Sequence, residues 1–260
     1  MPDFRDPATA ARLALRCLDL TSLNDADTEA DITRLCTRAL GPWGRPAAVC
    51  VWPRLAAVAR QQLPAGVAVA AVANFPDGST DVARAVRDTQ AIVQAGAQEV
   101  DVVLPYAALQ SGDDASVVQL LRAVRAACPG RLLKVILETG VLQTDALIRR
   151  AAELALDAGA DFLKTSTGKT PVSATPAAAA VLLRAIAAHP AAASGVGFKA
   201  SGGIRTVSEA VTYFSLVADI LGPEALQPAR FRIGASSLLA DIEAVLGGAA
   251  AVPEPPAQGY

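Results

Sequence analysis

Four lysines are the residues of this sequence best suited to covalent chemistry: Lys134, Lys164, Lys169 and Lys199. The other 19 of its 23 basic residues are arginines. Arginine stays protonated in proteins, whereas a lysine that is desolvated or lies beside another cation can lose its proton and become a nucleophile. The scarce lysines lie at the polar ends of short apolar runs, or in the glycine-containing step after one, so they indicate amine chemistry and a Schiff base in particular.

A carboxylate and two of these lysines form a plausible reaction centre. Lys164 and Lys199 end two successive apolar runs, which would be neighbouring strands of a parallel barrel. Two ammonium groups a few ångströms apart disfavour each other's charge, so one pKa should fall and supply a free amine. Asp101, on an earlier run, can accept and return protons. An amine, a second cation and a carboxylate suffice for an aldol cleavage through an iminium.

Glycines and serines after the last two apolar runs predict a phosphate site. Glycine lets backbone amides approach a phosphate, and a helix N-terminus directs unpaired amides at it. The loops after strands seven and eight of an α/β barrel frequently bind phosphate. The alternative is that these segments are ordinary tight turns. The predicted phosphate contacts are Lys169, Gly202, Gly203, Gly234, Ser236 and Ser237.

Apolar runs alternate with helical segments along the whole chain. Eight runs are typical of buried parallel strands, namely 17–21, 46–52, 67–74, 98–104, 132–138, 161–165, 195–200 and 230–234. Helical periodicity lies between them, for example over 80–95, 113–128, 143–157, 175–188 and 206–221. Helix starts are expected at Ser79 or Thr80, at Thr144 and at Thr206, whose hydroxyls can accept bonds from free backbone amides.

This order predicts an α/β protein with a single (β/α)8 TIM barrel. Eight strand–helix units in 260 residues favour a closed barrel over an open sheet. We assign the barrel, with an extra N-terminal helix, to residues 1–246. Residues 247–260 are rich in Gly, Pro and Ala and predict a flexible C-terminal tail.

Composition limits the classes of partner and site. The sequence is 52% hydrophobic with a net charge of −2, which supports a large core and gives no reason to expect nucleic acid. It has no run of about 18 apolar residues, so we expect no membrane span. The N-terminus lacks a signal pattern, which predicts a cytoplasmic protein with reduced cysteines. His189 is the one histidine and there is no CxxC motif, so we expect no metal and no cofactor.

Eight segments of the chain closely resemble the deoxyribose-phosphate aldolase family, in the family's order and over nearly the whole sequence. The pair DFLKTSTGK (161–169) and GFKASGGIRT (197–206) is the most specific part of the resemblance. The others are CLDLTSLN (17–24), VCVWPR (49–54), NFPDG (74–78), EVDVVLPY (99–106), LKVILETG (133–140) and RIGASSLL (232–239).

The resemblance implies reversible cleavage of 2-deoxy-D-ribose 5-phosphate to acetaldehyde and D-glyceraldehyde 3-phosphate, in deoxyribonucleoside catabolism. It implies that Lys164 forms the Schiff base and that Asp101 and Lys199 relay protons. It also implies that further residues contact the substrate: Asp19, Thr21, Lys134, Thr165 and Tyr260, together with the phosphate contacts above. Tyr260 has the alternative of a disordered chain end. Lys134 either tunes the site or simply pairs with a carboxylate.

Three other functions stay open at this point. The chain could be a barrel aldolase for a different phosphorylated aldehyde, a sugar-phosphate sensor without turnover, or a metal-dependent aldolase. In each case we expect small sugar phosphates and aldehydes as partners, with a homodimer as a candidate assembly.

Overall fold

The computed structural model describes residues 4–248 and contains a closed barrel of eight parallel strands. The strands pair in chain order, and β8 pairs with β1 to close the barrel. All eight predicted strands are present, with ends shifted by one or two residues. They are β1 (Leu18–Thr21), β2 (Ala48–Val51), β3 (Ala68–Ala73), β4 (Glu99–Val103), β5 (Leu132–Ile136), β6 (Phe162–Lys164), β7 (Gly197–Ser201) and β8 (Phe231–Ala235).

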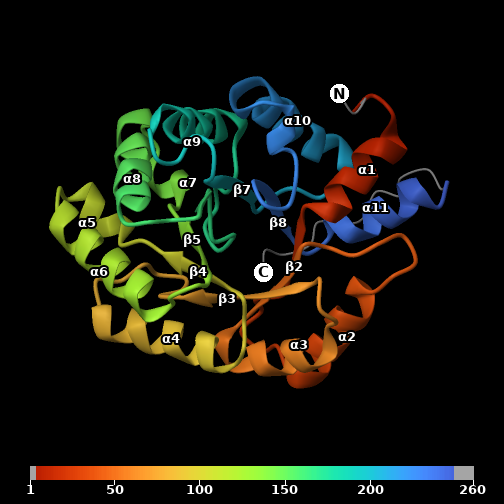
Figure 1. Ribbon diagram of the computed structural model, residues 1–260, viewed down its shortest axis with the longest axis horizontal. Helices are drawn as coiled ribbons and strands as arrows, with labels where there is room; N and C mark the ends of the chain where they lie inside the picture. Colours follow the sequence, from red (N-terminus) through yellow and green to blue (C-terminus); the bar gives the residue numbers. More distant parts are fainter. Residues whose placement is uncertain (1–3, 249–260) are drawn as a thin grey trace.

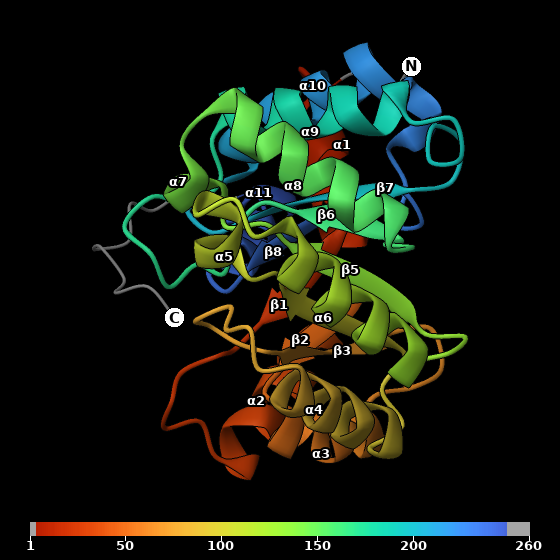
Figure 2. The same cartoon turned by 90° about the vertical axis from the view of Figure 1, so that its left-hand side faces the viewer.

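Helices surround the barrel on its outside (Figure 1), which confirms the predicted TIM-barrel fold. The turned view in Figure 2 shows α4, α6, α8 and α9 side by side over one flank of the strands. The helices that follow the strands are α2 (Glu29–Ala39), α3 (Ala56–Gln62), α4 (Val82–Gln94), α6 (Asp114–Ala127), α8 (Asp145–Asp157), α9 (Pro176–Ala188), α10 (Val207–Leu221) and α11 (Leu238–Leu246).

Shorter elements complete the chain. The predicted N-terminal helix is α1 (Pro7–Arg16), which packs against α10 and α11. Two short helices lie in the loops after β4 and β5, and two 3-10 turns lie elsewhere: α5 (Tyr106–Gln110), α7 (Thr139–Leu142), η1 (Pro53–Leu55) and η2 (Pro223–Ala225). The end of α11 at Leu246 coincides with the predicted end of the barrel segment. Of the predicted tail, 247–260, only Gly247 and Gly248 are among the described residues.

Helix starts follow the predicted capping chemistry with one exception. The side chains of Thr144 and Thr206 accept bonds from the third residue of their helices, and Thr206 forms a capping box with Glu209. The prediction of Ser79 or Thr80 for α4 is wrong, because Asp81 caps this helix. The Ser79 hydroxyl instead donates to Asn74 Oδ1 at 3.0 Å, which uses it to hold the loop after β3.

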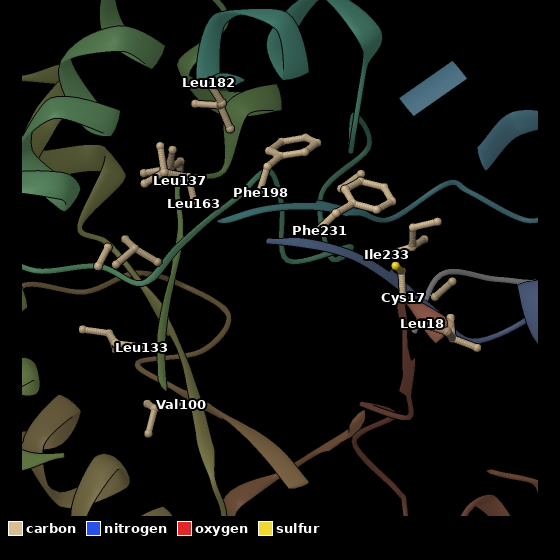
Figure 3. Close-up of a cluster of buried hydrophobic side chains, with 14 of the residues drawn as sticks. Cys17, Leu18, Val100, Leu133, Leu137, Leu163, Leu182, Phe198, Phe231 and Ile233 are labelled. Carbon is tan, nitrogen blue, oxygen red and sulfur yellow. The ribbon is translucent and has the colours of Figure 1, made fainter. Parts of the chain in front are cut away.

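Side chains alternate between the two faces of each strand and so divide the core in two. Figure 3 shows the outer core, in which Leu163, Phe198, Phe231 and Ile233 point away from the barrel centre toward the helices. The interior holds a much smaller apolar cluster: Leu23, Ala48, Cys50, Ala70, Val72, Phe75, Val103 and Ile136. The remaining interior positions are largely charged, and they form the candidate site.

Candidate active site

Seven charged residues meet inside the barrel, and each residue as a whole is at most 5% exposed. We call them the charged cluster: Asp19 of β1, Glu99 and Asp101 of β4, Lys134 of β5, Lys164 of β6, Lys199 of β7 and Arg232 of β8. Burying charges is costly unless they are paired. A cluster of this size in the middle of a barrel therefore indicates a functional site.

Strand register explains why these residues meet. Lys164 lies opposite Lys199 across β6 and β7, as the sequence predicted for neighbouring strands. Asp101 lies opposite Lys134, and Lys199 opposite Arg232. Because neighbouring parallel strands point opposed side chains to the same face, each of these pairs projects into the barrel.

Asp101 is the centre of the cluster. Its Oδ2 accepts hydrogen bonds from Lys164 Nζ at 3.0 Å and from Lys199 Nζ at 2.8 Å. Its Oδ1 accepts a third bond from Lys134 Nζ at 2.7 Å. The two lysines proposed from sequence therefore share one carboxylate oxygen, a geometry that allows a proton to pass between them by way of that oxygen.

Lys164 is the cluster's most readily deprotonated amine. Burial lowers its pKa, and the neighbouring charge of Lys199 lowers the pKa further, against the opposing effect of Asp101. The direction agrees with the prediction from the lysine pair, although burial contributes more than the second cation does. The side chain is only 2% exposed, so its free amine would react in an environment with little water.

The neighbours of Lys164 are held in their charged forms. Burial by itself lowers the pKa of Lys199, but Asp101 and Asp19 outweigh burial and raise the pKa well above its ordinary value. Burial by itself raises the pKa of Asp101, but Lys134, Lys199 and Lys164 together lower it well below its ordinary value. The site thus places an ammonium and a carboxylate beside a lysine whose pKa is lowered.

Glu99 and Arg232 form a second layer that the sequence reading missed. Arg232 donates to Asp19 at 2.7 Å and to Glu99 at 2.8 Å, while Lys134 Nζ donates to Glu99 at 2.5 Å. The available signal was alternation: Glu99 precedes Asp101 by two residues and Arg232 precedes Gly234 by two, so all four face the interior.

Lys134 makes three ion pairs with carboxylates, to Glu99, Asp101 and Asp19. Burial opposes its charge, yet Asp101 and Glu99 outweigh burial and raise its pKa. Lys134 therefore does pair with carboxylates. It is also linked to Lys164, because both lysines donate hydrogen bonds to Asp101. Asp19 has a similar place between Lys199 and Arg232.

The two predicted threonines, Thr21 and Thr165, form hydrogen bonds with backbone groups. Thr21 donates to the carbonyl of Asp19 at 2.8 Å. Thr165 accepts from the Ser201 amide at 3.0 Å and donates to the Ser201 carbonyl at 3.2 Å, which ties β6 to β7 just beyond the two lysines. Ser166 was not singled out from the sequence, yet its buried hydroxyl has no hydrogen-bond partner among the described residues.

A buried glutamate holds the loop after β6. Glu138 has left-handed backbone geometry (φ 54°), and its carboxylate accepts bonds from the hydroxyls of Thr167 and Thr170. Burial raises its pKa, and the bonds from Thr167 oppose that rise. The segment from Lys164 to Thr170 is thereby fixed at both ends, by the strand and by Glu138.

The predicted phosphate loops lie together at the ends of β6, β7 and β8. The Gly202 amide donates to the Gly234 carbonyl at 3.3 Å, which joins the loop after β7 to the end of β8. Gly202 has φ 84°, and a Cβ there would lie 2.6 Å from Ser173 and 3.3 Å from Gly168 Cα. Only glycine fits this close approach. Gly203, with φ 82°, follows it and is exposed.

The N-terminus of α11 completes this region. Ser237 precedes the helix without forming a side-chain cap, and Ser236 is exposed beside it. Backbone amides at such a start attract anions. Gly234 also meets a steric requirement, because a Cβ there would lie 2.5 Å from Ser201 Oγ and 2.9 Å from Lys199 Cε. Its glycine makes room for the Lys199 side chain.

Lys169 and Tyr260 are the two remaining predicted contacts. Lys169 follows Gly168, and its Nζ lies 3.7 Å from the exposed carboxylate of Asp25, in the loop after β1. Tyr260 lies outside the described residues.

Among residues 4–248, no helix has the length and apolar character to cross a membrane.

Comparisons with known proteins identify the family of this chain. Residues 13–244 match the DeoC/LacD family aldolase pattern. A crystal structure from Coccidioides immitis, described as a "putative deoxyribose-phosphate aldolase", is 31% identical with a TM-score of 0.78, over 88% of this chain and 85% of that one. A deoxyribose phosphate aldolase from Aeropyrum pernix, described as a unique tetramer, is 27% identical with a TM-score of 0.69, over 92% and 97%.

A third structure, from Toxoplasma gondii, supports the fold: its TM-score is 0.85 at 23% identity, over 95% of this chain and 98% of that one. The family match covers most of the chain and includes every residue of the charged cluster. The chain belongs to the DeoC/LacD family of aldolases.

Proposed function

We propose that this aldolase reversibly cleaves 2-deoxy-D-ribose 5-phosphate to acetaldehyde and D-glyceraldehyde 3-phosphate, in the cytoplasm, as a step of deoxyribonucleoside catabolism. The observation that carries the proposal is Lys164, a buried amine with a lowered pKa that shares one Asp101 oxygen with Lys199. The deoxyribose-phosphate names of the similar structures from Coccidioides immitis and Aeropyrum pernix support the choice of substrate.

The proposed reaction begins with neutral Lys164. Its lone pair attacks the aldehyde carbon of the open-chain sugar, and loss of water from the carbinolamine gives an iminium. Removal of the proton from the C3 hydroxyl breaks the C2–C3 bond, whose electron pair moves into the iminium to leave an enamine and release D-glyceraldehyde 3-phosphate. Protonation of the enamine carbon and hydrolysis then release acetaldehyde and restore the lysine.

Asp101 and Lys199 are the proposed proton carriers for these steps. The Lys199 ammonium donates to both Asp101 and Asp19, so it can give up a proton and be reprotonated within the same network. The glycine loops after β7 and β8, with the start of α11, would hold the phosphate at the far end of the substrate. Binding there would fix the reacting carbon against Lys164.

Borohydride trapping tests the substrate, the intermediate and the residue together. With 2-deoxyribose 5-phosphate, borohydride should leave a stable adduct on the peptide that contains Lys164, located by mass spectrometry. Arg122→Lys, which adds a lysine at an exposed position of α6, is the matched control and should gain no adduct there. Active enzyme that traps no lysine would contradict the mechanism.

Lys164→Arg should lose cleavage by about 10³-fold or more while folding normally, because arginine keeps the cation but forms no Schiff base. Appreciable turnover would indicate another nucleophile.

Activity should persist in chelator, since the proposed chemistry uses no metal. A panel of phosphorylated aldehyde acceptors separates this substrate from others, and light scattering tests the proposed homodimer.

A further inference from the structure

The charges of the cluster do not balance when every group is ionised. Three carboxylates, Asp19, Glu99 and Asp101, face four cations, Lys134, Lys164, Lys199 and Arg232. A net positive charge would then be buried inside the barrel, which is unfavourable at low dielectric. Loss of a single proton from one lysine makes the cluster neutral.

The ion pairs identify which lysine is in excess. Lys134 contacts three carboxylates, whereas Lys199 and Arg232 contact two each. Lys164 has one ion pair, with Asp101, and shares that oxygen with Lys199. Lys164 is therefore the cation whose proton is least stabilised.

Arg232 takes up carboxylate charge without contacting Lys164. Its guanidinium bonds to Asp19 and Glu99, donates to the Pro228 carbonyl at 2.5 Å, and lies 5.5 Å from the ring centre of Phe162. This side chain is only 6% exposed and arginine does not deprotonate in proteins, so Arg232 is a fixed charge.

We propose that Arg232 and Glu99 are positioning residues that set the charge balance of the cluster, so that Lys164 becomes its surplus cation and the lysine that gives up its proton. This inference rests on the proposed function, because it assumes that Lys164 acts as the free amine. Without Arg232, three carboxylates would face three lysines, and Lys164 would keep its proton. Without Glu99, the excess of positive charge would grow, and Lys164 would lose its proton more readily.

The other described groups that face the site make no ion pair with the cluster. On β2 the interior residue is Cys50. Burial raises the pKa of its thiol, which favours the neutral form. The interior positions of β3 are Ala70 and Val72. Glu138, beyond β5, bonds to Thr167 and Thr170 and makes no ion pair with the cluster; burial raises its pKa, and the charge of Lys164 opposes that rise.

The test is the pH at which Lys164 becomes reactive, measured without relying on the sugar substrate. Acetaldehyde and cyanoborohydride ethylate a free amine, and peptide mass spectrometry gives the labelling rate of Lys164 at each pH. Relative to the unaltered protein, the midpoint should rise by about one to two pH units in Arg232→Met and fall in Glu99→Gln. The double variant Arg232→Met/Glu99→Gln should return toward the original midpoint, since two carboxylates then face three lysines and the excess is again one positive charge.

Arg232→Lys is the matched control, because it keeps the charge and should keep the midpoint. Opposite shifts that cancel in the double variant cannot come from general loosening of the barrel, which would move every variant the same way. An unchanged midpoint in folded Arg232→Met overturns the inference. If Arg232→Met does not fold, Glu99→Gln decides alone, and a midpoint that stays or rises overturns it.

The same experiment separates this inference from the proposed function. Labelling of Lys164 in a protein that does not cleave 2-deoxyribose 5-phosphate would reject that substrate and leave the charge balance testable. If the unaltered protein shows no labelling of Lys164 at any pH, both the proposed nucleophile and the charge-balance inference fail.

Discussion

The two sides of the barrel interior differ sharply in chemistry. On one side, β2 and β3 present Ala48, Cys50, Ala70 and Val72, which belong to the inner apolar cluster. On the other side, the six strands β1 and β4 to β8 all contribute to the charged cluster. The apolar side helps to exclude water from the interior, and the charged side supplies paired ions. Lys164 needs both, because burial and a neighbouring cation each lower its pKa.

Strand β5 contains both kinds of position and gives the largest expected difference in stability. Lys134 and Ile136 are both interior residues of β5, two positions apart, in the charged and apolar clusters respectively. Lys134→Met should lower the free energy of unfolding by about 3–5 kcal/mol, because it removes the one cation that contacts all three buried carboxylates. Ile136→Val should cost about 0.5–1.5 kcal/mol. Urea unfolding of both variants measures the difference. Equal losses of unfolding free energy in the two variants would show that the charged and apolar sides do not differ in their contribution to stability.

Acid should act through the charged side. Although burial opposes it, the neighbouring cations lower the pKa of both Asp19 and Asp101 below the ordinary value of 3.8. The two ionised carboxylates therefore stabilise the folded state fully above pH 3.8. This stabilisation is lost progressively as the pH falls below 3.8 toward the lowered pKa of each group. The loss should approach about 1.4 kcal/mol per pH unit for each carboxylate.

Urea unfolding between pH 5 and pH 3, at about half-unit steps, measures this slope. Asp101→Asn should flatten the slope, whatever it does to stability at neutral pH. If the slope is the same in Asp101→Asn, Asp101 is not an ionised member of the cluster.

Exchanging single hydroxyl groups between the two sides should give the smallest effects. Val72→Thr puts a hydroxyl into the apolar side and should cost about 1–2 kcal/mol, because the polar group loses water on burial. Thr21→Val removes a hydroxyl whose bond to the Asp19 carbonyl is worth about 1 kcal/mol. Thermal unfolding compares the pair. A stabilising Val72→Thr would mean that the apolar side is not dry.

Thr21→Val also tests a residue predicted to contact substrate. Its hydroxyl is satisfied by its own strand, so a structural role predicts an unchanged KM for 2-deoxyribose 5-phosphate. A raised KM with unchanged kcat would instead support the substrate contact that the family resemblance implies.

Much of the fold could be predicted because its signals are local. Each strand appears in the sequence as a short apolar run, and helix starts such as Thr206 with Glu209 carry their own capping chemistry. Where a local signal had two candidates the prediction failed: Ser79 bonds to Asn74, and Asp81 caps α4 instead. Sequence alone could not decide between hydroxyl and carboxylate, since the choice depends on the path of the loop before the helix.

Glu99 and Arg232 show what local signals leave out. Each lies within a strand, two residues before a predicted site residue: Glu99 before Asp101, and Arg232 before Gly234. Neither lies at the end of an apolar run. Their importance comes from contacts across the barrel: Arg232 on β8 meets Glu99 on β4, and the two residues are separated by 133 positions in the chain. Only closure of the sheet brings them together.

The sequence by itself determined the barrel and the family, and it singled out the lysine that we propose as the nucleophile. Strand periodicity, the scarcity of lysine and the motifs around Lys164 and Lys199 are all properties of neighbouring residues. The tertiary structure decided how many carboxylates each cation contacts, and hence which lysine is in excess. That count depends on distances between strands remote in the chain, because the energy of a buried charge is set by its surroundings in space and not by its neighbours in sequence.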